Sequence, residues 1–414
     1  MGCGMSKYII RGGNPLVGTV EAQGSKNSAV AILLACIAVK DRVILRRVPY
    51  ITDVLDCIEI LRCLGGIVEW LDAGILSVDC TGIECGTVPE GIAGRIRAST
   101  YIMGAFINRF GWCPMLKSGG CSLGDRPVDL HVEAFVALGG RVCSDGGLKR
   151  YGSFNGRYDF SKITVGGTIN TVIAAACGSG ACMLKKCAKE PHVCDVIRFL
   201  NSCGADIVGE GSDCLSIRGV GDLHGCEFTI SGDMIEAGTY LIAGAATRGA
   251  VTVDGICPRE LESLCAVLSE MGLTVAVEDS SIRVFGEIVR GSRVETGAYP
   301  LFPTDLHPQI VALMGSTLYE SALRERVFGA DRFRYICELE KQGLRYGIEG
   351  DTVTVFGGGY RAAEVGATDL RGGAANVIAA LCADGVSAVG NVEYIERGYS
   401  DFIFKLRSLG ADVR

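Results

Sequence analysis

The stretch "VCDVIRFLNSCGADIVG", residues 193–209, holds an amphipathic helical pattern, a glycine junction and a short apolar segment in immediate succession. Up to Leu200 the apolar residues recur at the spacing of one helix face. Gly204 then stands where a left-handed residue would end a helix, and glycine takes that conformation without a Cβ clash. The pattern therefore predicts a helix, a glycine C-cap and a strand.

The same pattern occurs six times along the 414 residues. The first glycine after each helical segment recurs about every 70 residues, which favours a true repeat over unrelated helix–strand junctions. Segments such as "SIRVFGEIV" and "DTVTVFGG" supply strands between the helices. Six copies of an α/β unit suggest two domains of three units each. The six glycines are Gly65, Gly139, Gly204, Gly272, Gly343 and Gly410.

Two crossings between the domains follow from the order of the repeats. One is expected at "ISGD", residues 230–233, between the third and fourth copies. A second lies near residues 23–24 if the first strand, predicted over "KYIIRGGNPLVGTVEA", pairs with the last three copies. The repeat by itself leaves the second crossing open. The predicted domains are residues 24–231, and residues 1–23 together with 232–414.

Composition excludes several classes of function. A net charge of −7 argues against nucleic acid or an anionic membrane as the main partner. The longest apolar run, residues 29–39, is too short to span a bilayer, and the first residues lack a signal core. The 20 cysteines are dispersed without zinc-type pairs, and there are only 4 histidines. We therefore expect a cytoplasmic protein with reduced thiols and without a metal.

Cationic residues recur where helical patterns begin. "GSKN" places Lys26 and Asn27 directly before the apolar run, and "GRIRAS" places Arg95 and Arg97 before the next helical segment. Cations oppose the dipole at a helix N-terminus unless an anion lies between them. For the Lys26 motif taken alone, a solvated lysine beside an N-cap serine is the better explanation. Together they predict an anion site, if these helix ends converge on a groove between the domains.

Other turns add polar residues of the same kind. "GGCSLGDRPVDLH" places Cys121 at the tip of a glycine-rich loop, five residues before Arg126. "KITVGGTINT" has glycines that let backbone N–H groups approach a ligand. Four further turns, "FPTD", "DRFR", "TDLR" and "IERGYSD", contribute Asp305, Arg332, Asp369, Arg371 and Arg397.

The motifs "GSKN", "IRAS", "GGCSLGDRPVDLH", "FPTD", "TDLR" and "ERGY", in this order, resemble those of the UDP-N-acetylglucosamine 1-carboxyvinyltransferase family. The resemblance implies an α/β (α+β) fold of two inside-out domains, each with three βαβαββ-type units, and an active site in the interdomain cleft. It implies transfer of the enolpyruvyl group of phosphoenolpyruvate to the 3′-hydroxyl of UDP-N-acetylglucosamine with release of phosphate. That reaction is the first committed step of peptidoglycan synthesis, and it needs no cofactor.

The resemblance also implies roles for individual residues. Cys121 would be the general acid on a mobile loop and the target of the epoxide fosfomycin, and Asp305 would be the base. Cations around Cys121 would lower its thiol pKa in the empty enzyme. Phosphoenolpyruvate and nearby groups would be bound by Lys26, Asn27, Arg97, Arg126 and Arg397, of which Lys26 and Arg397 would also be catalytic. The UDP-sugar pocket would be lined by Arg126, Pro127, Val128, Asp129, Leu130, Lys162, Ile163, Thr164, Val165, Asp305 and Val327, and the closed site would be completed by Arg332, Asp369 and Arg371.

Departures from the family pattern keep alternatives open. Ser25 replaces the usual alanine, and "VFGADRFRY" is one residue longer than usual, which leaves the alignment of Arg332 open. A 5-enolpyruvylshikimate-3-phosphate synthase would lack the loop cysteine, and an RNA 3′-phosphate cyclase would have a more basic surface. A UDP-sugar-binding paralogue with little or no activity is a further alternative. The sequence leaves the oligomeric state open.

Overall fold

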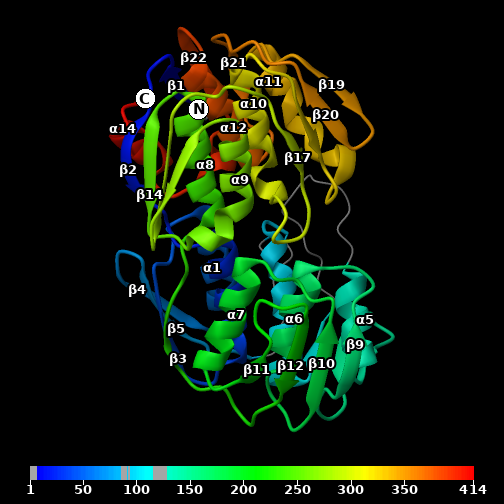
Figure 1. Cartoon of the computed structure of the whole chain (residues 1–414). Helices are drawn as coiled ribbons and strands as arrows, with labels where there is room; N and C mark the ends of the chain where they lie inside the picture. The colour runs from blue at the N-terminus through cyan, green and yellow to red at the C-terminus, as the bar shows by residue number, and fades with distance from the viewer. Residues whose placement is uncertain (1–6, 85–90, 92–93, 115–127) are drawn as a thin grey trace. The chain divides into compact units, whose positions relative to one another are not determined.

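The computed structural model describes residues 7–84, 91, 94–114 and 128–414. These residues divide into two compact units. The N-terminal unit holds the described residues between 24 and 231, and the C-terminal unit holds residues 7–23 and 232–414. Each unit has its own hydrophobic core, formed within its own helices and sheets. In Figure 1 the N-terminal unit runs from blue to green and the C-terminal unit from green to red, apart from the blue first strands.

One βαβαββ unit is continuous in the N-terminal unit. Its strands form a four-stranded sheet in the order β11-β12-β10-β9. The first two strands along the chain pair in parallel, and the remaining pairs are antiparallel. This unit contains the amphipathic segment and Gly204 identified from the sequence. Its elements are β9 (Gly156–Asp159), α6 (Val165–Ala175), β10 (Ala181–Lys185), α7 (Pro191–Ser202), β11 (Asp206–Val208) and β12 (Cys214–Arg218).

The C-terminal unit repeats this arrangement without a break in the chain. The sheet order is β17-β18-β20-β19, again with one parallel pair followed by two antiparallel pairs. The elements are β17 (Arg293–Glu295), α10 (His307–Ser316), β18 (Ser321–Arg324), α11 (Ile336–Lys341), β19 (Tyr346–Glu349) and β20 (Thr352–Val355).

The described residues form three more four-stranded sheets, and in each of them one strand comes from a distant segment of the chain. In the N-terminal unit, β13 (Glu227–Thr229) runs parallel to β3 (Arg42–Arg46), and β5 (Ile75–Asp79) and β4 (Ile67–Asp72) complete that sheet. In the C-terminal unit, one sheet has the order β15-β16-β14-β2 and another the order β21-β22-β1-β23. Their strands are β1 (Tyr8–Arg11), β2 (Val17–Glu21), β14 (Ala250–Asp254), β15 (Thr274–Val277), β16 (Ser281–Phe285), β21 (Glu364–Gly366), β22 (Val386–Gly390) and β23 (Asp412–Val413).

The N-terminal segment corrects one detail of the sequence analysis. "KYIIRGGNPLVGTVEA" reads as one strand, but it forms two strands that belong to different sheets. The break falls at "GGNP", where Gly13 has a φ of 89° and Pro15 has no N–H to donate to a ladder. β1 pairs with β22 and β23, whereas β2 pairs with β14.

The glycine prediction is confirmed at all six positions. The residue after each amphipathic helix has a φ between 94° and 110°, in the region that favours glycine. At Gly204 the N–H donates to the carbonyl of Asn201, 2.9 Å away, and so caps the last turn of α7. Each helix therefore ends where the sequence indicates, and the chain turns into the next strand.

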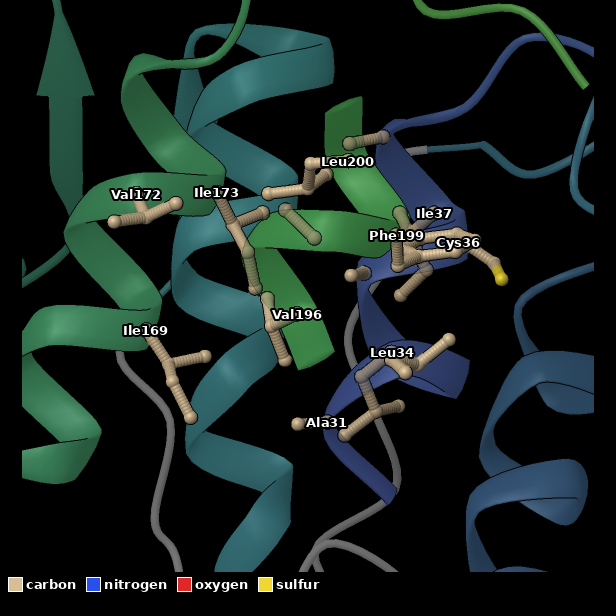
Figure 2. Close-up of a cluster of buried hydrophobic side chains, with 14 of the residues drawn as sticks. Ala31, Leu34, Cys36, Ile37, Ile169, Val172, Ile173, Val196, Phe199 and Leu200 are labelled. Atoms are coloured by element: carbon tan, nitrogen blue, oxygen red, sulfur yellow. The ribbon is translucent and has the colours of Figure 1, made fainter. Parts of the chain in front are cut away.

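Buried helices form the centre of each unit. In the N-terminal unit these are α1 (Lys26–Ala35), α4 (Ile102–Phe110) and α6, and in the C-terminal unit α8 (Met234–Ala246), α10 and α12 (Leu370–Cys382). Their sequences are apolar or small on nearly every side, which suits a helix enclosed by sheets and other helices. Figure 2 shows Leu34, Ile173 and Phe199 among the side chains that α1, α6 and α7 contribute to one core. This arrangement matches the predicted α/β fold class.

The remaining elements lie around these cores. No helix in the described ranges is both long and apolar enough to cross a membrane. A three-stranded sheet of the N-terminal unit has the order β6-β8-β7. The other elements used below are β6 (Trp112–Cys113), β7 (Gly140–Val142), β8 (Leu148–Arg150), α2 (Thr52–Cys63), α5 (Asp129–Ala137), α9 (Glu262–Glu270), α13 (Glu393–Glu396), α14 (Phe402–Ser408), η2 (Arg97–Tyr101), η4 (Thr304–Leu306) and η5 (Gly329–Tyr335).

Candidate active site

In the N-terminal unit, Lys26 is the first residue of the buried helix α1. The side chain of Ser25 caps this helix by accepting a hydrogen bond from the N–H of Ser28. The ammonium of Lys26 lies 2.8 Å from the carboxylate of Asp53 in the first turn of α2, and both side chains are largely buried. Asn27 follows as a half-buried residue in the same turn. Lys26 is therefore fixed at the start of α1 by a carboxylate from a neighbouring helix.

A second buried carboxylate, Asp195 in α7, fixes the start of α1 from another side. It accepts hydrogen bonds from the hydroxyl of Ser28 at 2.7 Å and the hydroxyl of Ser231 at 2.6 Å. Arg198, one turn further along α7, lies 3.3 Å from it. Because Ser231 is the last residue of the N-terminal unit, Asp195 ties the chain at this boundary to the first turn of α1.

Arg97 lies close to the first turn of α5. Burial, with the charge of Arg97 as the second cause, lowers the pKa of His131 to about 4. Nδ1 of His131 accepts a hydrogen bond from Nδ2 of Asn170 at 2.8 Å, and Oδ1 of Asn170 accepts one from the N–H of Gly104. These bonds fix the amide orientation of Asn170, so the neutral histidine carries its proton on Nε2. The arrangement connects α4, α5 and α6.

The predicted sugar-pocket residues of this unit stand at the starts of α5 and α6. Thr164 caps α6 by accepting a hydrogen bond from the N–H of Gly167, and Lys162 and Ile163 precede it as exposed residues. A Cβ added at Gly166 would meet the His131 ring at 2.9 Å, so the two helix starts lie against each other. Val128 precedes α5, and Asp129 and Leu130 lie in its first turn. Cys121, Arg126 and Pro127 lie outside the described residues.

Arg95, singled out with Arg97 in the sequence, has a different environment. Its guanidinium lies 2.9 Å from Glu59 and 3.3 Å from Asp56, both on α2. Half of the Arg95 side chain is exposed, so this is a surface ion pair. Arg95 therefore fits a structural contact with α2.

In the C-terminal unit, Asp305 lies between two arginines. Oδ2 of Asp305 is 3.0 Å from Nη2 of Arg371, and Oδ1 is 3.8 Å from Nη2 of Arg332. The guanidinium of Arg332 also donates to the carbonyl of Thr304 at 2.9 Å. The side chains of Arg332 and Arg371 are 2% and 4% exposed, whereas that of Asp305 is 34% exposed. The carboxylate is thus held by buried cations and remains accessible to solvent.

Arg371 is enclosed by groups that keep it protonated. Burial by itself would lower the pKa of Arg371, but the electrostatic effects of Tyr399, Asp305 and Asp233 raise it above its usual value. The guanidinium also lies over the Tyr399 ring, 5.4 Å from its centroid. Asp369 caps α12 by accepting hydrogen bonds from the N–H groups of Arg371 and Gly372. The cap fixes the backbone from which Arg371 reaches Asp305.

Two more predicted residues of the C-terminal unit lie on other segments. Arg397 follows the short helix α13 as its half-buried C-cap. Val327 stands in a turn after β18, with its side chain 45% exposed. The structure brings together Asp305, Arg332 and Arg371 by direct contact. Arg397 and Val327 lie in the same unit, on other segments of the chain.

Several residues in these networks were not predicted from the sequence. Asp53 and Asp195 hold the start of α1, and Glu325 holds the turn that contains Val327. The available signal was weak: Glu325 stands between Arg324 and Arg326 and fits a solvated turn, whereas Asp195 is an acidic residue in a mostly apolar helical segment. A buried charge is costly unless it is paired, so an acidic residue in such a position indicates a partner without naming it.

The two sets of residues differ in charge and suit different tasks. Lys26 and Arg97 in the N-terminal unit stand beside helix starts whose N–H groups favour an anion such as phosphate or carboxylate. In the C-terminal unit, an accessible carboxylate flanked by guanidinium groups presents oxygens that can accept a proton from a ligand. The described residues show no cluster of ligands that could hold a metal ion.

Comparison with known proteins shows the family to which the chain belongs. Residues 10–406 match the model of the EPSP synthase (3-phosphoshikimate 1-carboxyvinyltransferase) family. The chain belongs to the EPSP synthase family. Its curated relatives are named as transferases and match it over nearly their whole length, so this chain is a transferase.

Two relatives of this EPSP synthase family member carry the same descriptive name. UDP-N-acetylglucosamine 1-carboxyvinyltransferase 3 of Caldanaerobacter subterraneus subsp. tengcongensis is 42% identical, over 99% of this chain and 99% of the relative. UDP-N-acetylglucosamine 1-carboxyvinyltransferase 2 of Listeria monocytogenes is 40% identical, over 98% of this chain and 97% of the relative. The resemblance found in the motifs is thereby confirmed over the whole length of the chain.

Solved structures agree with the fold of this EPSP synthase family member. The enolpyruvyl transferase NikO from Streptomyces tendae superposes with a TM-score of 0.86 at 25% identity, covering 99% of both chains. EPSP synthase from Acinetobacter baumannii gives a TM-score of 0.75 at 16% identity, again over 99% of both chains. The second likeness concerns the fold alone.

Proposed function

We propose that this protein transfers the enolpyruvyl group of phosphoenolpyruvate to the 3′-hydroxyl of UDP-N-acetylglucosamine and releases phosphate. The observation that carries the proposal is the 42% identity, over nearly the whole chain, to a relative named for this activity. The reaction would be the first committed step of peptidoglycan synthesis in the cytoplasm, and so would serve cell-wall growth, cell shape and division. No cofactor is required by the chemistry.

Binding of phosphoenolpyruvate is assigned to the cationic residues. Lys26 and Arg97, at helix starts of the N-terminal unit, suit its phosphate and carboxylate groups. Asn27, Arg126 and Arg397 are assigned to the same anions or to groups next to them. Arginine pairs with either anion through two parallel hydrogen bonds, which fixes orientation as well as charge. A fixed orientation is what an addition to the double bond requires.

Proton transfers are assigned to Asp305 and Cys121. As the 3′-oxygen bonds to C2 of phosphoenolpyruvate, Asp305 takes the hydroxyl proton and the Cys121 thiol gives a proton to C3. The resulting tetrahedral intermediate then returns a proton from C3 to the Cys121 thiolate while the C2–O bond to phosphate breaks, which leaves an enol ether and free phosphate. The proton held by Asp305 passes to solvent, and both side chains regain their starting states. The 34% exposure of Asp305 is compatible with access to a hydroxyl, and Arg371 and Arg332 stabilise its charge.

The nucleotide sugar is assigned to turns of both units. In the N-terminal unit these are residues 126–130 before and within the start of α5, and residues 162–165 before α6. In the C-terminal unit they are Asp305 and Val327, with Asp369 and Arg371 completing the site. Thr164 and the exposed Lys162 and Ile163 offer a hydroxyl, an ammonium and an apolar surface at one helix start.

A phosphate-release assay tests this assignment. The protein is mixed with phosphoenolpyruvate and either UDP-N-acetylglucosamine or shikimate 3-phosphate. We expect phosphate release with the nucleotide sugar only. Release with shikimate 3-phosphate only would instead support the activity in the family description, 3-phosphoshikimate 1-carboxyvinyltransferase. Binding of the nucleotide sugar without phosphate release would support a non-catalytic paralogue.

A further inference from the structure

Glu325 is a fully buried carboxylate whose two oxygens each accept two hydrogen bonds. Oε2 accepts from the hydroxyl of Thr304 at 3.0 Å and is 2.8 Å from Nδ1 of His307. Oε1 accepts from the backbone N–H groups of Val327 at 2.9 Å and Phe328 at 3.1 Å. The side chain is 0% exposed, so water does not replace any of these partners. A single side chain thereby fixes two separate turns of the C-terminal unit.

The protonation states are consistent with this network. Burial would raise the pKa of Glu325, but His307 and the N–H groups of Val327 and Phe328 lower it overall. Burial lowers the pKa of His307 to about 4, so the imidazole is neutral. Nε2 of His307 has no hydrogen-bond partner within the described residues. Leaving an unprotonated nitrogen without a partner costs less free energy than leaving a buried N–H without one. Nδ1–H of His307 therefore donates to an ionised Glu325.

The two turns held by Glu325 both contain residues assigned to the substrate. Thr304 and His307 flank Asp305, within the segment formed by η4 and the first residue of α10. Arg332 fixes the same segment from the other side through the carbonyl of Thr304. Val327, held by its backbone N–H, presents an exposed side chain. Displacement of the Glu325 carboxylate would release both the backbone around Asp305 and the turn at Val327.

We propose that Glu325 is a positioning residue that sets the orientation of Asp305 toward the acceptor hydroxyl and the shape of the Val327 turn. The inference rests on the proposed function, because it takes Asp305 as the base and Val327 as a sugar contact. Glu325 itself is fully buried and does not touch substrate. Its effect on the reaction passes through the two turns that it joins.

A double-mutant cycle tests whether Glu325 acts through Asp305. Glu325→Ala removes the acceptor for four donors, and a misplacement of about 1 Å in a reacting group can cost ~100-fold in rate. We expect Glu325→Ala to lower kcat by about that factor in the wild-type background. In the Asp305→Asn background we expect the same change to lower kcat by less than about threefold, because residues that act as a unit are not additive. Equal losses in both backgrounds would overturn the proposal.

Binding measurements separate positioning from general damage to the fold. Calorimetry with UDP-N-acetylglucosamine is expected to show a Kd raised at least about tenfold in Glu325→Ala, whereas the KM for phosphoenolpyruvate stays within about twofold. A uniform loss of both affinities would contradict a role at these turns. Glu320→Ala, at an exposed acidic residue just before β18, is the matched control and should leave all constants unchanged.

A conservative variant covers the case in which Glu325→Ala does not fold. In Glu325→Gln the amide oxygen can still accept from Val327 and Phe328, and the amide N–H groups can donate to Thr304 Oγ1 and the other tautomer of His307. We expect it to retain sugar affinity within about threefold, with part of the kcat loss. Full loss of sugar binding in a folded Glu325→Gln protein would contradict the proposal. If the wild type releases no phosphate with UDP-N-acetylglucosamine, the proposed function fails, and this inference falls with it.

Discussion

The ammonium of Lys26 lies 2.8 Å from the carboxylate of Asp53, joining the first turns of α1 and α2. Both side chains are largely buried, so the pair is poorly screened by solvent. Lys26 is one of the residues to which we assign the phosphate and carboxylate of phosphoenolpyruvate. A ligand that binds there must share this lysine with Asp53. The carboxylate therefore orders Lys26 and also opposes an incoming anion.

Asp53→Asn is predicted to tighten binding of phosphoenolpyruvate. The amide keeps the shape of the side chain and removes the negative charge that competes for Lys26. We expect the KM for phosphoenolpyruvate to fall by up to about fivefold, which corresponds to about 1 kcal/mol of relieved competition for the ammonium. The melting temperature without ligand should fall, because Lys26 loses its charge partner. A raised KM in the folded variant would show that Asp53 mainly orients Lys26.

The buried contact between Arg371 and Asp305 predicts a large effect on stability. Arg371→Ala leaves Asp305 with Arg332 at 3.8 Å and removes a guanidinium that is 4% exposed. Removal of one partner of a buried pair costs about 3–5 kcal/mol. We expect a loss toward the lower end, about 3 kcal/mol, because Asp305 keeps access to water. Urea denaturation measures the change.

Arg334→Ala is the matched control for this prediction. Arg334 and Asp331 form a pair at 2.8 Å in the same part of the chain, with both side chains about half exposed. An exposed pair contributes about 0.2–1 kcal/mol, so Arg334→Ala should change stability very little. Similar losses of unfolding free energy in Arg371→Ala and Arg334→Ala would contradict a larger stabilising contribution from the buried pair.

His131 predicts a loss of stability in acid. Its pKa in the folded protein is about 4, below the usual value of 6.5, because the side chain is buried and Arg97 is near. Between these values the unfolded chain binds more protons, so the free energy of unfolding falls as pH falls from 6.5 to 4. The contribution is at most roughly 3 kcal/mol. His307, with a pKa of about 4, adds an effect of the same sign.

Urea denaturation at pH 7.5 and at pH 5 measures this dependence in variants. His131→Leu should lower stability at the higher pH, since Asn170 loses an acceptor, but it should reduce the difference between the two conditions. His224→Gln, at an exposed histidine, should leave that difference unchanged. An undiminished pH dependence in His131→Leu would contradict the assignment of a buried neutral imidazole.

Fosfomycin is predicted to modify Cys121, which lies outside the described residues. Incubation with fosfomycin and UDP-N-acetylglucosamine should place an adduct on the Cys121 peptide, identified by mass spectrometry. Cys63, an exposed cysteine elsewhere, serves as the internal control and should remain unmodified. Cys121→Ser should greatly reduce turnover while sugar binding stays nearly intact. An inhibited enzyme without this adduct would be evidence against the cysteine assignment.

The repeat made much of the fold predictable from the sequence. A glycine after an apolar helix end has one dominant structural meaning, and all six such glycines have the left-handed φ that was expected. The apolar run at residues 29–39 likewise predicted a buried helix, and its residues are buried throughout. Local patterns of this kind act within one or two turns of the chain, so one sequence is enough to recognise them.

Contacts between distant residues were beyond this kind of prediction. Ser28 and Asp195 are separated by 167 positions, and no local pattern indicates that their side chains meet. Glu325 follows a short strand as an acidic residue that also fits a solvated turn. Only the packing of the repeats buries it against Thr304 and His307. The sequence motifs predicted the candidate site residues, but they did not predict the buried carboxylates that fix those residues in place.

Identification of the product tests the central claim most directly. The protein is incubated with phosphoenolpyruvate and UDP-N-acetylglucosamine, and the nucleotide sugar is isolated and analysed by NMR. We predict an enolpyruvyl ether on the 3′-oxygen of the sugar, recognised by its vinyl methylene protons, with one phosphate released for each ether formed. Recovery of unchanged UDP-N-acetylglucosamine from folded protein, or an ether on a different acceptor, would contradict the claim.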